Sequence, residues 1–171
     1  MIPRLLSSVV LLALAGCAAV PVEPTPAAPA VPQAAATVAT IRAAAAGAGG
    51  ELDVQPLRDP QVEDLRDAAR QQEAAGQFAA AVTSLDEALQ LNPDDPALLQ
   101  ERAEAAVLVG DHAGAESFAR RAFEQGSQLG PLCRRHWATV RQMRYLAHDG
   151  AGARAAQQQL DACRVAPPAR Y

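Results

Sequence analysis

The residues that could do chemistry in this chain of 171 residues are its three histidines and its three cysteines. His112, His136 and His148 stand without a serine elbow, a His-Glu-x-x-His run or a separated carboxylate pair of the kind that hydrolysis requires. The adjacent acids Asp94 and Asp95 lie at an expected helix start, where they interact favourably with the helix dipole. We therefore predict no catalytic residue, cofactor or metal, and we expect that the protein is not an enzyme.

The N-terminal residues have the organisation of an export signal. A single positive charge at Arg4 precedes an apolar run from Leu5 to Ala15. The run is far shorter than the roughly 20 residues of a membrane-spanning helix. Residues 1–16 are therefore predicted to be a signal peptide, although an uncleaved anchor, or ordinary cleavage between Ala15 and Gly16, is the alternative.

Cys17 directly follows the residues Leu-Ala-Gly and, with them, resembles the lipobox of bacterial lipoproteins. The resemblance implies cleavage before Cys17, a diacylglyceryl group on its thiol and an N-acyl chain such as palmitate. Three acyl chains would make dissociation from the bilayer negligible. Ala18 stands where inner-membrane retention usually needs aspartate, so the resemblance implies an anchor in the outer membrane, on its periplasmic side.

The residues after Cys17 have the composition of a spacer. Five prolines in an alanine, valine and threonine background favour an extended conformation of about 3.1 Å per residue. We find no amphipathic stripe between Ala34 and Ala46, so a helix there would be marginal, and the glycines at 47–50 would end it. We predict a disordered tether over residues 17–50, an extended lead-in over 51–61 and a disordered tail over 166–171.

The composition of the remaining residues favours helices. All 15 basic residues are arginine, alanine is abundant and aromatic residues make up only 4% of the chain. This composition suits closely packed helices and argues against a sheet rich in valine, isoleucine and tyrosine. The formal net charge of -4, together with an exported address, argues against a nucleic-acid partner.

An internal repeat organises these residues. Small and apolar residues recur after 34 positions, with Gly76, Ala81, Leu85 and Ala88 returning as Gly110, Ala115, Ala119 and Ala122. With the proline at Pro93, this pattern resembles the tetratricopeptide repeat, a helix-turn-helix unit. The resemblance implies an all-α fold, a solenoid of about three helical hairpins over residues 62–165. The whole chain also resembles small lipid-anchored tetratricopeptide proteins of Gram-negative envelopes.

The helices are expected at 62–75, 78–91, 96–109, 112–125, 131–148 and 151–165. The third unit fits only if its first helix is four residues longer, because Ala113-Gly114-Ala115 returns as Ala151-Gly152-Ala153 after 38 positions rather than 34. We interpret it as a divergent, capping unit whose arginine and glutamines supply a polar outer face.

In such repeats the first helix of each unit lines a concave groove. The resemblance therefore places a set of polar side chains in a partner-binding groove: Glu63, Arg66, Arg70, Gln100, Glu104, Arg134 and Arg141. This surface would suit an extended peptide or a helix that carries both charges. The alternative is a solvated helix face.

The last prediction is a disulfide between Cys133 and Cys163. If lipidation uses Cys17, two thiols remain in an oxidising compartment, where bridges form and persist. Cys133 opens the first helix of the third hairpin and Cys163 ends the second, so an antiparallel hairpin brings both to the same end. Two separate buried thiols, or a metal site that adds His136, are the alternatives.

These features predict a lipid-anchored adaptor or assembly factor that recruits a protein partner at the inner face of the outer membrane. An alternative is a structural lipoprotein that binds the cell-wall polymer through its third unit, since seven arginines face only two acids from Pro131 onward.

Overall fold

The computed structural model describes residues 31–46 and 59–164 of the chain, and within these ranges it has seven α-helices and no strand. The helices are α1 (Val31–Ala43), α2 (Pro60–Ala74), α3 (Phe78–Leu91), α4 (Pro96–Leu108), α5 (His112–Gln125), α6 (Gly130–Leu146) and α7 (Gly150–Ala162). The signal peptide, Cys17, most of the lead-in and the C-terminal tail lie outside the described residues. None of the described helices is long and apolar enough to cross a membrane.

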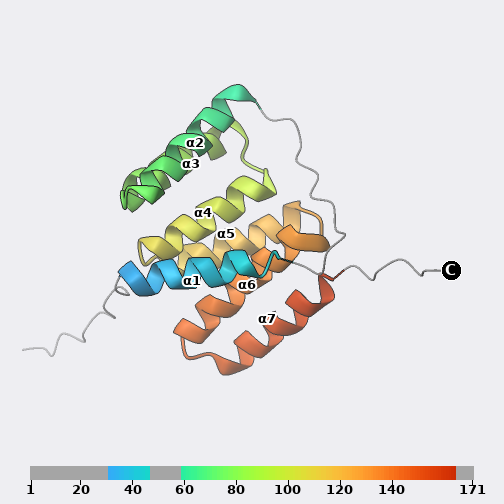
Figure 1. Cartoon of the computed structure of the whole chain (residues 1–171). Coiled ribbons are helices and arrows are strands. Elements are labelled where there is room, and N and C mark those ends of the chain that lie inside the picture. The colour runs from blue at the N-terminus through green and yellow to red at the C-terminus, as the bar shows by residue number, and fades with distance from the viewer. Residues whose placement is uncertain (1–30, 47–58, 165–171) are drawn as a thin grey trace, which may run out of the picture.

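Each predicted hairpin is present. Helices α2 and α3, α4 and α5, and α6 and α7 pack as three antiparallel pairs that follow one another across the molecule (Figure 1). The all-α repeat fold predicted from the sequence is thereby confirmed. The expected lengthening of the third unit is also present, because α6 has 17 residues and α4 has 13.

Helices α2, α4, α5 and α7 each begin after an aspartate whose side chain accepts from a free backbone N–H group. The side chain of Asp59 accepts from the backbone N–H of Gln61, and that of Asp95 accepts from those of Ala97 and Leu98. Proline follows each of these two aspartates at the first helical position, where no backbone N–H is needed. The Asp59 cap starts α2 two residues earlier than predicted, so residues 60 and 61 belong to the helix and not to the lead-in.

Two of the repeated glycines lie in the turns between paired helices, where the backbone has a positive φ. Gly76 and Gly110 adopt φ values of 73° and 81°, which glycine reaches without steric cost. In the third unit His148 takes the corresponding position with φ 56°, so a non-glycine residue makes this turn.

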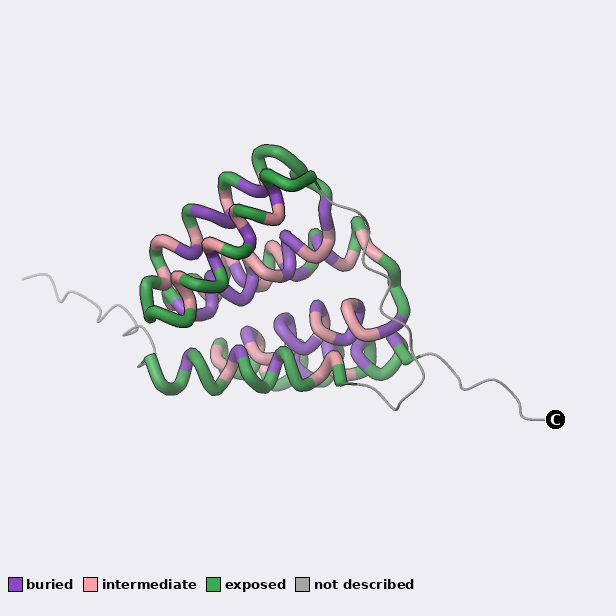
Figure 2. Tube along the Cα trace, turned by 45° about the horizontal axis from the view of Figure 1, so that its top comes forward, coloured by how far each residue is buried: buried purple, intermediate pink, exposed green. Residues whose placement is uncertain are grey.

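Alanines let the helices of neighbouring pairs approach closely. The buried faces of α3, α5 and α7 consist mainly of small side chains, which are Ala81, Ala88, Ala115, Ala119, Ala122, Ala153 and Ala156. Buried residues line the facing sides of the helices, while the outer sides are exposed (Figure 2). Larger side chains pack where the second unit meets the third: the rings of Phe123 of α5 and Trp137 of α6 meet edge to face at 5.1 Å.

Helix α1 corrects the prediction of a disordered tether over residues 17–50. Residues 31–43 form a helix that packs against α4 and α6 (Figure 1). Its buried residues are Ala34, Val38 and Ile41, a stripe at spacings of four and three that the surrounding alanines hide in the sequence. Tertiary contact, rather than local preference, explains why this short segment is helical.

Candidate protein-binding groove

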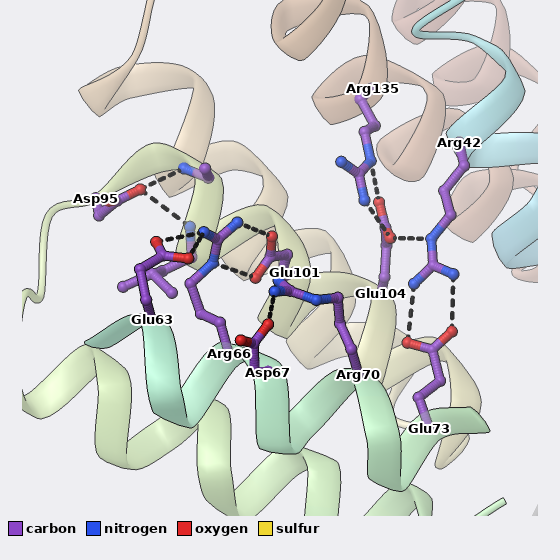
Figure 3. Close-up of polar contacts among 12 residues, drawn as sticks. Arg42, Glu63, Arg66, Asp67, Arg70, Glu73, Asp95, Glu101, Glu104 and Arg135 are labelled. Atoms are coloured by element: carbon purple, nitrogen blue, oxygen red, sulfur yellow. Dashed lines mark hydrogen bonds and ion pairs between the residues drawn. The ribbon is translucent and has the colours of Figure 1, made fainter. Parts of the chain in front are cut away.

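The first helices of the three units, α2, α4 and α6, contribute the charged side chains of the predicted groove. Two of them, Arg66 and Glu104, form ion pairs with further charged side chains of neighbouring helices, and Arg42 of α1 pairs with Glu73 of α2 (Figure 3). Beside α1, a cleft of about 400 Å³ remains between α2, α4 and α6. Its polar lining consists of Arg42, Arg66, Arg70, Glu73, Glu101 and Arg135.

Glu104 lies at the centre of the network. Its side chain is fully buried and accepts from Arg42 Nε at 2.7 Å, from Arg135 Nη2 at 2.7 Å and Nε at 2.5 Å, and from Gln100 Nε2 at 2.8 Å. Hydrogen bonds between charged groups are about twice as strong as neutral ones. One carboxylate on α4 therefore joins α1 to α6.

Arg42 also reaches the first unit. Its Nη1 and Nη2 atoms donate to Glu73 of α2 at 2.7 and 2.9 Å. These hydrogen bonds, more than any other contact, raise the pKa of the Arg42 guanidinium, and Glu104 adds to the shift against the opposing effect of burial. The C-terminal turn of α1 is thus bound to both α2 and α4.

Arg66 forms a second junction, between α2 and α4. It donates to Glu63 of its own helix at 2.6 Å and to Glu101 of α4, with Nε at 2.9 Å. The hydrogen bonds to Glu101 are the main cause of the raised pKa of Arg66. Arg70 pairs with Asp67 at the exposed surface of α2.

A neutral histidine lies behind Glu104. Gln100 Nε2 donates to Glu104 and to Thr139 Oγ1, and because a carboxylate only accepts, the amide oxygen must face His136 Nδ1 at 2.8 Å. Nδ1 therefore carries the proton. Burial, with the nearby charge of Arg135 as a smaller cause, lowers the pKa of His136 to about 3.

This histidine makes stability depend on pH. Its pKa is lower in the folded state, so the folded protein binds fewer protons, and the contribution to stability is complete above pH 6.5 and lost as the pH falls toward 3. Between pH 7 and 4.5 we expect the free energy of unfolding of wild type to fall by about 2 kcal/mol more than that of His136→Asn. Urea titrations at each pH measure this difference. His148→Asn, at an exposed histidine, should keep the wild-type slope, and equal slopes in wild type and His136→Asn would contradict the prediction.

The structure alters the predicted set of groove residues. Arg66, Gln100, Glu104 and Arg134 are buried, so they do not form the exposed polar surface that was expected, and their role in binding a partner stays a prediction. They do lie on the first helices of the units, but α1 packs over α4 and α6 there, and neighbouring side chains bind their polar groups. Arg70 remains exposed as expected. Arg141 is half-buried and donates to Gln157 of α7, and so is engaged within its own hairpin.

Four further residues of this network were missed by sequence reasoning: Arg42, Glu73, Glu101 and Arg135. The nearest signal was Arg42 itself, which is the single charged residue between 31 and 46. Because that segment was interpreted as a tether, its charge had no predicted partner.

Arg134 holds the end of α1. Its guanidinium donates to the backbone carbonyls of Ala44 at 3.1 Å and Ala45 at 2.9 Å. A cation there also complements the negative end of the helix dipole. The face of α4 and α6 therefore already seats a helix, and Arg42 of that helix reaches Glu73 of α2 beside it.

The two cysteines of the third unit meet as the hairpin geometry predicts. The Cα atoms of Cys133 and Cys163 lie 5.7 Å apart and their sulfur atoms 1.99 Å apart, which is disulfide bonding distance. The amide of Gly130 also donates to the carbonyl of Cys163 at 2.7 Å, which ties the end of α7 to the start of α6. Among the described residues, no group of three or more histidine, cysteine or acidic side chains could hold a metal ion.

Comparison with known proteins supports this architecture. A tetratricopeptide repeat family model matches residues 73–133, from the end of α2 into α6. The solved globular C-terminal domain of P. aeruginosa LpoP is 31% identical in sequence, with a TM-score of 0.57, and the match covers 61% of this chain and 99% of that one. The chain belongs to the same family as this LpoP domain. Its helical part is a tetratricopeptide-type repeat, and no curated protein sequence matches it significantly.

The likeness to LpoP covers a share of this chain close to that of helices α2 to α7. The solved LpoP structure is described as a C-terminal domain, and the helical repeats here likewise follow an N-terminal region. The ion pairs of α2, α4 and α6 therefore belong to a tetratricopeptide-type domain.

Proposed function

We propose that this chain is a non-catalytic adaptor of the bacterial envelope that binds a helical segment of a partner protein in the groove of α2, α4 and α6. The observation that supports the proposal is the seating of α1 on α4 and α6, where its apolar residues and its charge match the surface beneath. Helix-in-groove recognition uses apolar anchors at spacings of three and four, as α1 supplies. The tetratricopeptide repeat match and the likeness to LpoP support a protein-binding role.

The alternative of cell-wall binding through the third unit loses support from the structure. It rested on the excess of arginines over acids from Pro131 onward, but the arginines of α6 are engaged within the protein. Arg135 pairs with Glu104, Arg144 with Glu116 and Asp149, and Arg134 with the end of α1. We therefore retain protein binding as the single proposal.

Photo-crosslinking in cells tests the adaptor function. A photoreactive residue at Arg70, whose side chain is 54% exposed at the cleft, should form adducts with one or a few envelope proteins. A photoreactive residue at Glu124, exposed on α5, is the matched control on the outer layer of helices. If neither position gives a protein adduct, or if both give the same adducts, the groove is not the partner-binding surface.

The proposed address depends on Cys17. The lipobox-like sequence before it supports lipidation and an outer-membrane anchor on the periplasmic side. We expect Cys17→Ser to prevent lipidation and to leave the signal peptide uncut, because the substitution removes the thiol that accepts lipid. Mass spectrometry of fractionated cells measures the mass of the N-terminal fragment. A mutant that is still cut before residue 17, or a wild-type protein without acyl chains, would contradict the proposed lipid anchor.

A further inference from the structure

Helix α1 holds its place in the groove through a small contact. Ala34, Val38 and Ile41 are its buried side chains, and most of its other residues are exposed. They belong to one core cluster with Val107 of α4 and Met143 of α6, and Leu146 packs against this cluster. We call this surface, together with Glu104 and Arg134, the α1 seat.

The charges of the seat specify what it accepts. Glu104 is fully buried and belongs to α4, whereas the side chain of Arg42 is 43% exposed and belongs to the docked helix. Removal of α1 would take one charged hydrogen-bond donor from Glu104 and two carbonyl acceptors from Arg134. A buried charge that loses such partners is costly, so the seat favours any helix that restores both contacts.

We propose that the α1 seat is the partner-binding surface, that α1 is its resident occupant, and that a partner helix of the same chemistry displaces it. Such a helix has small or β-branched apolar residues at spacings of four and three. It also carries an arginine in its last turn, placed to meet Glu104 and Glu73, and ends where its last carbonyls meet Arg134. This inference rests on the proposed adaptor function and names the chemistry of the partner.

The size of α1 makes the exchange feasible. A 13-residue helix is marginal by itself in water, so α1 depends on contact with its seat to be helical. Because α1 and the seat belong to one chain, the resident acts at an effective concentration on the order of millimolar. A partner must therefore match the seat well to enter, and the cleft between α1 and α2 exposes Arg70 beside the place where it would enter.

Peptide binding to the full chain tests the exchange. A fluorescent peptide of residues 31–46 is titrated into Cys17→Ser protein and into the same protein with Ile41→Asp, which introduces a charge at a fully buried position of α1. We expect the apparent Kd to be at least tenfold lower with Ile41→Asp, because the resident no longer competes. Ala39→Asp, on the exposed face of α1, should leave the Kd within about twofold of the parent protein. A peptide with Arg42→Ala should bind at least tenfold more weakly.

Hydrogen exchange on the protein with its native α1 sequence provides a measurement that does not depend on Ile41→Asp folding. Excess unlabelled peptide should accelerate exchange of the resident α1 amides at least tenfold, while α4 and α6 keep their protection. Unchanged α1 exchange at saturating peptide, or equal peptide affinity in the parent and Ile41→Asp proteins, would overturn the proposal.

The two proposals fail in distinguishable ways. If the peptide displaces α1 but no cellular protein crosslinks at Arg70, the seat is exchangeable and the adaptor function is wrong. If a protein crosslinks at Arg70 while α1 stays protected in its presence, the adaptor function stands and displacement of α1 is wrong.

Discussion

Glu104→Gln is expected to lower the free energy of unfolding by about 3 kcal/mol, the lower part of the range for breaking a buried ion pair. The substitution keeps the size of the side chain but removes the charge that Arg42 and Arg135 share. It also places an amide donor among guanidinium donors, so that a single oxygen must accept the hydrogen bonds that two oxygens accept in the wild-type protein. Because Arg42 and Arg135 are partly exposed, water can solvate them, which keeps the loss moderate.

Asp67→Asn is the matched control for this measurement. Asp67 and Arg70 form an ion pair with both side chains more than half exposed, and such pairs contribute about 0–1 kcal/mol. Urea denaturation at pH 7 compares the two variants with the parent protein. Equal losses at Glu104 and Asp67 would show that the buried network has no special role in stability.

Cys133→Ala combined with Cys163→Ala is expected to lower the free energy of unfolding by about 3–4 kcal/mol. The sequence separation of 30 sets the size of the loop that the bridge closes in the unfolded chain. Either single substitution should give most of the full loss, because one substitution already breaks the bridge, and the second should add little. This non-additivity separates a bridge from two independent buried thiols.

Denaturation of the single and double variants, all in the Cys17→Ser background, measures the bridge. Hydrogen exchange should locate the loss in α6 and α7, where the bridge joins the open end of the hairpin. Two reactive thiols per chain in denatured, unreduced Cys17→Ser protein, or additive single losses, would contradict a disulfide.

The helical hairpins could be predicted because their signals are local. Asp95 before Pro96 caps α4 within four residues, and Gly76 and Gly110 provide turns at a fixed distance from the alanines that follow them. The unusual length of α6 was also visible, as a repeat spacing of 38 in place of 34. Capping, turn conformation and helical period depend on neighbours in sequence, so the pattern of residues specifies them.

The groove was predicted only in part. The repeat placed Arg66, Gln100, Glu104 and Arg134 on the first helices, where the structure has them. Their burial was not predictable, since it depends on partners from other helices: Glu101 of α4 for Arg66, Thr139 and His136 of α6 for Gln100, and the docked α1 segment for Glu104 and Arg134. The three residues of α1 that become buried are too few, and their alanine background too uniform, to distinguish a docked helix from a marginal one.

The sequence by itself determined the three helical hairpins, their caps and turns, and the meeting of Cys133 and Cys163 at one end of a hairpin. The tertiary structure alone decided which charges are buried and what they bind. Arg42 meets Glu104 across 62 residues of sequence, and Arg134 meets the carbonyl of Ala44 across 90. Such contacts depend on the packing of whole helices against one another, because burial and charge pairing are properties of the assembled surfaces rather than of any local pattern.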